Sequence, residues 1–179
     1  MARGQSIRSY AQAAFEVAVA HNALDRWEKD LADVQIMLSN PDFAALLDAP
    51  QVPFKVKLDG VQTLLREASP QVRNFVAILV QSRQTARFGS ISREFRRLAD
   101  DRRGIARAEV VTAVPLDDER RRRIAEDLGR IVGRKIVMTE KVDPKVLGGI
   151  VARVGDRLID GSTRTRLHDL RGALAVRPS

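Results

Sequence analysis

Glycines, acidic turns and arginines are concentrated in residues 142–170, which read "VDPKVLGGIVARVGDRLIDGSTRTRLHDL". Such a run could form a phosphate-binding loop, a catalytic loop or plain scaffold. A Walker loop requires G-x-x-x-x-G-K-[ST], and a dinucleotide-binding fingerprint requires G-x-G-x-x-G before a helix. Neither pattern is present. Gly148 and Gly149 instead precede an alternating apolar segment, which indicates a turn or a close backbone approach.

Side chains for nucleophilic or acid–base catalysis are scarce. The chain has no cysteine and two histidines, His21 and His168. Ser162, His168 and Asp169 cannot form a triad on one helix, because adjacent helical residues point about 100° apart. The absence of cysteine also excludes disulfides and thiolate metal sites. We therefore predict no catalytic residue, and a protein that is not itself an enzyme.

Acidic pairs are the remaining candidates for a metal site. They are Asp100-Asp101, Asp117-Asp118 and Asp156 with Asp160. All three fall at predicted helix ends or turns, where carboxylates cap backbone amides and complement the helix dipole. The spacing of an EF-hand loop is absent. The sequence thus predicts no metal site and no cofactor.

Basic residues give the chain a formal net charge of +8, and arginine dominates: six of the 31 basic residues are lysine, which leaves 25 arginines. The densest run is "RRRR" at 120–123. Flanking acids offer ion pairs at i,i+3 and i,i+4 spacing, including Asp118–Arg122 and Glu119–Arg123. Two readings stay open, a solvated ion-paired face and phosphate contact. The second makes the alternative function an arginine-rich nucleic-acid-binding protein, although the few aromatics offer no stacking platform.

Hydropathy indicates a chain that stays in the cytoplasm. Apolar residues make up 44% of the sequence, enough for a true core. No apolar run approaches the roughly 18 residues of a membrane span. The first 22 residues read as an amphipathic helix rather than as a signal peptide.

Residues 1–105 read as six helices, which short loops would pack into a bundle. The first starts with Ser6 as its N-cap, and the second ends at Asn40-Pro41. The others cover residues 42–49, about 53–68, the run from Ser69-Pro70, and the run from about Ser90. Inward-facing residues are expected at Ile7, Ala11, Ala14, Phe15 and Ala18 in the first, Leu24, Trp27, Leu31, Val34 and Leu38 in the second, Val56, Val61, Leu64 and Leu65 in the fourth, and Ile91, Phe95 and Leu98 in the sixth.

Two of these helices are candidates for partner binding. The apolar face of the first is built largely of alanines, and such a shallow face admits another helix, either within the bundle or from a partner. Residues 75–80 of the fifth are nearly all apolar, which is typical of a central helix or of one that meets a partner.

The pattern changes in residues 106–179, which we interpret as a second domain. A strand at 106–116, a helix capped by Asp117 and ended by Gly133, and a strand at 135–142 form a βαβ unit with parallel strands. The helix carries Ile124, Leu128, Ile131 and Val132 as its apolar stripe. A hairpin at 150–160 turns at Gly155-Asp156, and a last helix covers 162–174. The fold class is therefore mainly α with a smaller α+β part.

Four segments of the sequence resemble segments of a single known family. The run at 142–171 resembles the C-terminal signature of the delta subunit of the F-type ATP synthase, the bacterial counterpart of the mitochondrial oligomycin-sensitivity-conferring protein. "SYAQAAF" at 9–15, "NFVAILVQSRQ" at 74–84 and "VVTAVPL" at 110–116 are similar to other segments of that family. The resemblance covers the whole chain.

The resemblance implies a non-catalytic stator subunit that holds the catalytic head against rotor torque. In this family the N-terminal domain, here 1–105, grips the N-terminal helices of the alpha subunits between its first and fifth helices. The matching positions are Tyr10, Ala14, Phe15, Phe75, Leu79 and Arg83. The C-terminal domain, here 106–179, meets the b subunits of the peripheral stalk, and we expect that contact at 150–174.

Two further expectations depend on this resemblance. The chain would be peripheral, at the cytoplasmic face of the bacterial cell membrane. If the groove that contains Ala14 is exposed to solvent in the free chain, Ala14→Asp should block docking of the partner and leave the fold largely intact.

Overall fold

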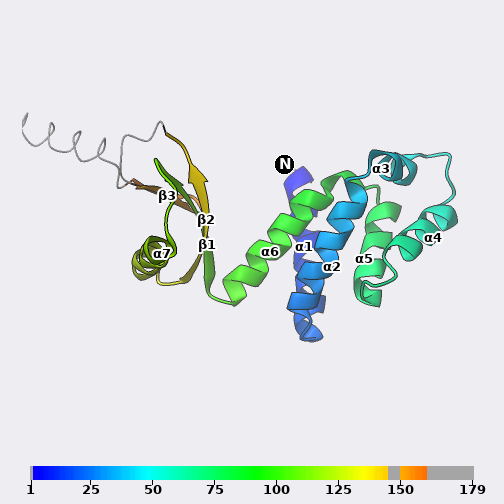
Figure 1. The fold of residues 1–179 in the computed structure, drawn as a ribbon. Helices are drawn as coiled ribbons and strands as arrows, with labels where there is room; N and C mark the ends of the chain where they lie inside the picture. Colours follow the sequence, from blue (N-terminus) through cyan, green and yellow to red (C-terminus); the bar gives the residue numbers. More distant parts are fainter. Residues whose placement is uncertain (1, 145–149, 161–179) are drawn as a thin grey trace, which may run out of the picture. The chain divides into compact units, whose positions relative to one another are not determined.

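The computed structural model describes residues 2–144 and 150–160 of the chain. The chain divides into two compact units, Met1–Ala99 and the residues from Asp100 onward. The fold is mainly helical with a small four-stranded mixed sheet, as the sequence predicted in outline (Figure 1). The predicted last helix, Gly148-Gly149 and the Ser162, His168 and Asp169 group lie outside the described residues.

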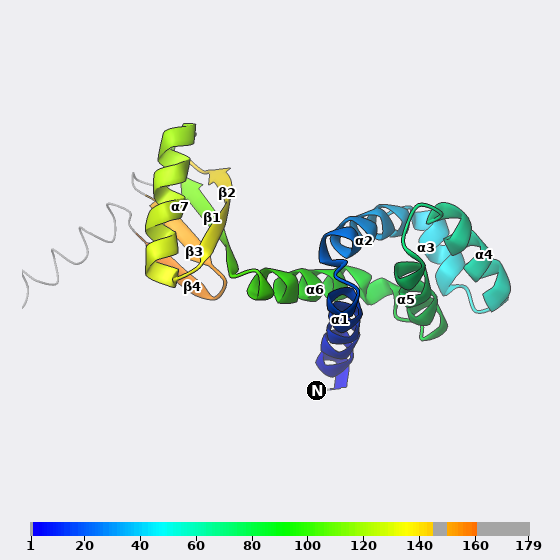
Figure 2. The ribbon, with the colours of Figure 1, turned by 90° about the horizontal axis from the view of Figure 1, so that it is seen from below.

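Helices make up the whole N-terminal unit (Figures 1 and 2). Their bounds are α1 Ala2–Ala20, α2 Leu24–Leu38, α3 Pro41–Asp48, α4 Phe54–Leu64, α5 Pro70–Gln81, the 3₁₀ turn η1 Thr85–Arg87 and α6 Phe88–Arg102. Two boundaries differ from the prediction. Because α1 already begins at Ala2, Ser6 is inside the helix and is not its N-cap. α4 is shorter than predicted, since the chain leaves the helix after Leu64.

One hydrophobic core joins these helices. α1 contributes Ala11, Ala14 and Ala18, as predicted. A chain of aromatic contacts crosses it: Phe15 meets Phe95 edge-on at 6.4 Å between ring centroids, Phe95 stacks on Trp27 at 5.8 Å, and Trp27 tilts against Phe75 at 5.8 Å. α1, α6, α2 and α5 thus share one aromatic cluster.

The inward face of α4 is narrower than predicted. Val61 and Leu65 are buried, but Val56 and Leu64 are 50% and 56% exposed. Leu65 and Val61 are four residues apart and lie on one row, whereas Leu64 is about 100° from Leu65. The prediction that Val56 and Leu64 face the core is therefore wrong.

A buried carboxylate joins α2 to the start of α5. Asp30 is 1% exposed and accepts a hydrogen bond from Arg26 Nε at 2.8 Å. Its other oxygen accepts from the backbone N–H of Ser69 at 2.8 Å. Ser69 is the N-cap residue of α5, with Pro70 following, but its own side chain makes no capping bond. Asp30 thus holds the backbone amide of the N-cap residue itself and ties α2 to the start of α5.

Both α1 and α5 end in a left-handed residue that is not glycine. Asn22 has φ 50° and Arg83 has φ 53°. After α5, Arg83 N–H donates to the carbonyl of Val80 at 3.1 Å, and Gln84 N–H donates to Leu79 at 2.8 Å. This pair of bonds is the Schellman motif, whose left-handed position glycine normally occupies.

The C-terminal unit is a sheet covered on one face by a helix. Its elements are β1 Ile105–Thr112, α7 Asp118–Val132, β2 Lys135–Val142, β3 Ile150–Val154 and β4 Arg157–Asp160. The strand order is β2-β1-β3-β4. β1 pairs in parallel with β2, and β3 is antiparallel to both β1 and β4. The predicted parallel βαβ pairing and the hairpin with its turn at Gly155 (φ 58°) are confirmed.

α7 begins and ends where the sequence predicts. The Asp117 carboxylate accepts from Arg120 N–H at 2.7 Å, and Gly133 ends the helix with φ 70°. Leu128 packs with Ala108, Val110, Ala152 and Val154 of the sheet. Ile131 is 62% exposed, so its predicted inward position is wrong. The helix contacts the sheet through the row containing Ile124, Leu128 and Val132, and Ile131 lies beside that row.

Candidate functional site

α1 and α5 both pack into the N-terminal core, α1 through Ala11, Ala14 and Ala18 and α5 through residues such as Phe75 and Leu79. Each exposes a branched apolar side chain: Val17 is 39% exposed and Ile78 is 50% exposed. Both were missed from the sequence. For Ile78 a signal was present, because the buried residues at 72, 75, 76, 79 and 80 define one face of α5 and leave position 78 off it.

The six predicted interface residues divide into two groups. Ala14, Phe75 and Leu79 are 2%, 7% and 1% exposed and belong to the core. Tyr10 and Phe15 are partly buried and pack against that core, while Arg83 is exposed. The aromatic chain through Trp27 links Phe15 to Phe75. Ala14, Phe75 and Leu79 thus form a buried support. Tyr10, Phe15 and Arg83 form a margin that is partly or fully open to solvent.

The burial of Ala14 corrects one expectation. In the free chain Ala14 is core, not open surface, so a carboxylate at this position would be buried without a partner. That costs several kcal/mol or forces the site to open. The premise that Ala14 lies on open surface is therefore wrong, and Ala14→Asp is now expected to destabilise the N-terminal unit.

The chemistry that this arrangement supports is apolar contact with another helix. Aliphatic and aromatic side chains on α1 and α5 offer shape and apolar area for such a contact. Among the residues that the structure describes, no group of three or more His, Cys, Asp or Glu could hold a metal ion. Asp100 and Asp101 form ion pairs with Arg107 and Arg134, each at 2.6 Å.

Glu140 on β2 bonds both the loop before α7 and α7 itself. Its carboxylate accepts from the backbone N–H of Leu116 at 2.7 Å and from Arg121 Nε at 2.9 Å. These two hydrogen bonds hold the pKa of Glu140 below its ordinary value, the backbone amide having the largest effect. Glu140 in turn raises the pKa of Arg121. The loop before α7 is thereby tied to β2.

The arginine run on α7 is partly neutralised by flanking acids, as predicted, although by other pairs than the two named from the sequence. Arg120 pairs with Asp117 at 3.4 Å, and Arg121 pairs with Asp118 at 3.1 Å and with Glu140 at 2.8 Å. The two pairs within the helix have the i,i+3 spacing, one of the two spacings predicted. Within the described part of the chain, Arg122 and Arg123 have no ion pair.

Residues 7–174 match the sequence profile of the family described as ATP synthase delta (OSCP) subunit. The chain belongs to this family. It is 35% identical over 177 residues to the ATP synthase subunit delta of Desulfitobacterium hafniense, which spans 98% of the chain and 99% of that protein. It is 36% identical over 180 residues to the one from Heliobacterium modesticaldum, covering 99% and 97%.

The fold agrees with this membership. A chain of the mitochondrial ATP synthase hexamer of Toxoplasma gondii superposes with a TM-score of 0.68 at 23% identity, over 96% of this chain and 98% of that one. Members of the delta family are non-catalytic stator components of the F-type ATP synthase, so this chain is not an enzyme by itself.

The family match gives no support to the nucleic-acid-binding alternative. Membrane association of a delta subunit is through the assembled complex. Over the described ranges, 2–144 and 150–160, no helix combines the length and apolar character needed to span a membrane.

Proposed function

We propose that this delta-family chain joins the catalytic head of an F-type ATP synthase to its peripheral stalk through two separate surfaces. Residues 1–105, as a six-helix bundle, would grip the N-terminal helices of the alpha subunits. Residues 106–179, as a βαβ unit with a hairpin and a last helix, would meet the b subunits. The complex would place the chain at the cytoplasmic face of the bacterial cell membrane. The observation that carries the proposal is the family match over residues 7–174.

The proposed alpha-binding surface is supported by the exposed apolar atoms of α1 and α5. Val17 and Ile78 offer apolar area that a docked helix would remove from water, worth about 1 kcal/mol for each half-exposed side chain. Tyr10 and Phe15 supply the half-buried margin, and Arg83 supplies an exposed cation at the end of α5.

Ala14, Phe75 and Leu79 take a different part in this proposal. They are buried, so they would shape the surface from beneath instead of covering the partner directly. The stacked rings of Trp27 and Phe95 keep that support rigid. A rigid support suits a joint under load, because less conformational entropy is lost on binding.

The proposed b-subunit contact begins at the hairpin. In the sheet formed by the described residues, β4 is an edge strand, a position that can accept pairing with another chain. Leu158 on this strand is 61% exposed. These two features support a contact that starts at Ile150 and continues to Leu174.

Calorimetric titration of the full chain with a synthetic peptide of the alpha subunit's first residues tests the alpha-binding surface. Ile78→Asp should weaken binding by about ten-fold or more, because it places a charge in an apolar contact. Ile36→Asp is the matched control, since Ile36 is 71% exposed on α2, outside the proposed surface. Circular dichroism should show an unchanged helix content in both variants.

Equal affinities for the two variants would rule out α5 as the binding helix. The stator role has a separate test: the chain should be recovered from membranes together with alpha and b subunits. Recovery with neither would overturn the role itself.

A further inference from the structure

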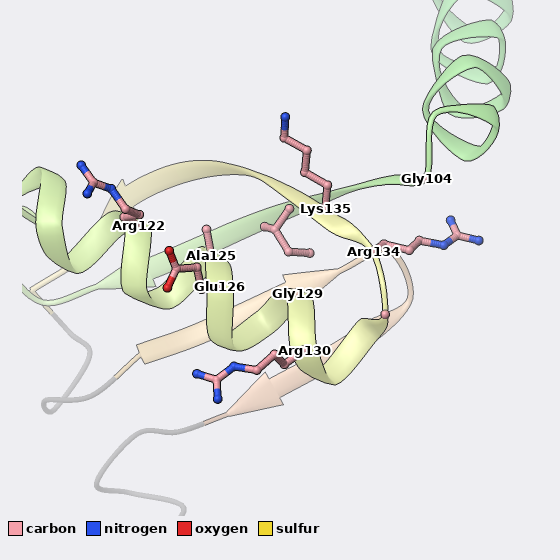
Figure 3. Close-up of a pocket in the computed structure, with 10 residues that line it drawn as sticks. Gly104, Arg122, Ala125, Glu126, Gly129, Arg130, Arg134 and Lys135 are labelled. Carbon is pink, nitrogen blue, oxygen red and sulfur yellow. The ribbon is translucent and has the colours of Figure 1, made fainter.

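A groove of about 750 Å³ lies between α7 and the start of β2 (Figure 3). Its lining consists of Gly104, Arg122, Ala125, Glu126, Gly129, Arg130, Gly133, Arg134, Lys135 and Ile136. Four of these side chains are cationic and one is anionic. None of the six proposed alpha-contact residues, and no residue of the 150–160 hairpin, takes part.

Packing explains why the floor of the groove is low. A Cβ on Gly129 would lie 3.1 Å from the carbonyl oxygen of Arg134, so glycine allows α7 to approach the loop before β2. Gly133 adopts φ 70° to end the helix. Ala125 and Ile136 complete a floor that is small and apolar.

The cations around this floor are not equivalent. Arg130 pairs with Asp127, and Arg134 pairs with Asp101 at 2.6 Å. Arg122 and Lys135 have no ion pair among the residues that the structure describes, and both are exposed. In Figure 3 both side chains extend away from the floor, with Ala125 between them. The groove therefore presents two uncompensated positive charges on either side of an apolar strip.

Charge identifies the kind of occupant. Residues 161–179 contain four arginines and one aspartate, so the chain's own C-terminal segment has the wrong sign. A second copy of the chain has a net charge of +8 and would be repelled as a whole. An occupant with an excess of carboxylates is attracted.

A nucleic acid fits less well than a peptide. Protein–DNA complexes use several phosphate contacts, about six to ten in well-studied cases, and the groove offers two unpaired cations. Its lining has no aromatic side chain on which a base could stack.

We propose that this groove binds an acidic segment of a partner protein. Carboxylates of the segment contact Arg122 and Lys135, and a small apolar side chain lies over Ala125 and Ile136. The contact is separate from the one proposed for residues 150–174, and it does not depend on that one.

Photo-crosslinking in the assembled complex tests the groove. A photoreactive p-benzoylphenylalanine replaces Glu126 in the full chain, and the complex is isolated from membranes and irradiated. We expect an adduct whose partner peptide, read by mass spectrometry, carries more Asp and Glu than Lys and Arg. The same group at Thr139, which is exposed on the other face of the sheet, should not label that peptide.

Charge reversal then tests the chemistry. Arg122→Glu with Lys135→Glu should lower the yield of the Glu126 adduct by about ten-fold, because two attractions become repulsions. Lys141→Glu with Arg123→Glu is the matched control, with the same change of charge on exposed residues outside the groove. It should leave the yield unchanged.

Several results would overturn the proposal: no adduct, an adduct with nucleic acid, lipid or a second copy of the chain, or an equal loss in both charge-reversed variants. The stator role is judged separately, by whether the chain is still recovered with the complex. Loss of the adduct with normal recovery would reject the groove alone.

Discussion

At the scale of single residues, Glu140 joins β2, the loop that precedes α7, and α7 itself. Its pKa is lowered in the folded chain, so the folded state favours the ionised carboxylate. Such a group contributes stability above its unfolded-state pKa, and that contribution is lost as the pH falls through the folded-state pKa. The C-terminal unit is therefore expected to lose stability in acid, when Glu140 becomes protonated.

We expect Glu140→Gln to lower the free energy of unfolding of the C-terminal unit near neutral pH. In this variant the free energy of unfolding should also fall less steeply as the pH is lowered. The measurement is the urea midpoint by circular dichroism at several values between about pH 7 and pH 3. Glu126→Gln is the control, because Glu126 is an exposed carboxylate on the same helix, α7. A steep acid loss that persists in Glu140→Gln would mean that another carboxylate is responsible.

Residue-scale prediction from the sequence was uneven for a physical reason. Helical periodicity identified buried positions such as Trp27, Val34 and Phe95, because these lie in the middle of an apolar face. It failed at the margins of a face, as at Leu64 and Ile131, where the neighbouring element decides whether a side chain is covered. It could not find Asp30, whose partner Ser69 is 39 residues away.

At the scale of elements, the Schellman turn after α5 places Arg83 in a conformation that favours glycine. A side chain with a Cβ at φ 53° costs about 1 kcal/mol. Arg83 therefore occupies a position at which glycine would cost less free energy of folding. This cost supports a role for Arg83 outside the fold of the free chain.

We expect Arg83→Gly to leave the free energy of unfolding unchanged or to raise it by up to about 1 kcal/mol, and to weaken binding of the alpha-subunit peptide. Urea unfolding and calorimetric titration measure the two effects. Asn22→Gly is the matched control, because Asn22 holds the same left-handed position after α1. It should leave the affinity unchanged. A clear loss of stability in Arg83→Gly would show that the side chain stabilises the turn instead.

Element boundaries were predictable where a local signal fixes them. β2 at Lys135–Val142 and the hairpin strands match the predicted ranges, since glycine and aspartate turns delimit them. The cap of α7 by Asp117 was likewise visible. The start of α1 was not, because several polar residues there could each have served as a cap, and the helix continues to Ala2. The exposure of Ile78 on α5 was missed, although its position off the buried face of the helix gave a signal.

At the scale of the whole molecule, each unit has its own hydrophobic core. One contains Trp27, the only tryptophan of the chain, and the other centres on Val110 and Leu128. Tryptophan fluorescence therefore reports on the N-terminal unit alone. This gives a direct way to ask whether the two units unfold independently.

We expect Val110→Ala to destabilise the C-terminal unit by about 2 kcal/mol through the cavity it leaves, without moving the urea midpoint of Trp27 fluorescence. Val76→Ala is the matched change in the other core, since both valines are fully buried. It should move the fluorescence midpoint. A shift of that midpoint in Val110→Ala would show that the units unfold as one.

The strand directions have a mechanical consequence for a subunit that resists torque. β4 runs parallel to β1, because each is antiparallel to β3 between them. Tension applied at Ile105 and at Asp160 would therefore act along the strands. The hydrogen bonds between the strands would be loaded in shear, all at once, instead of breaking one after another.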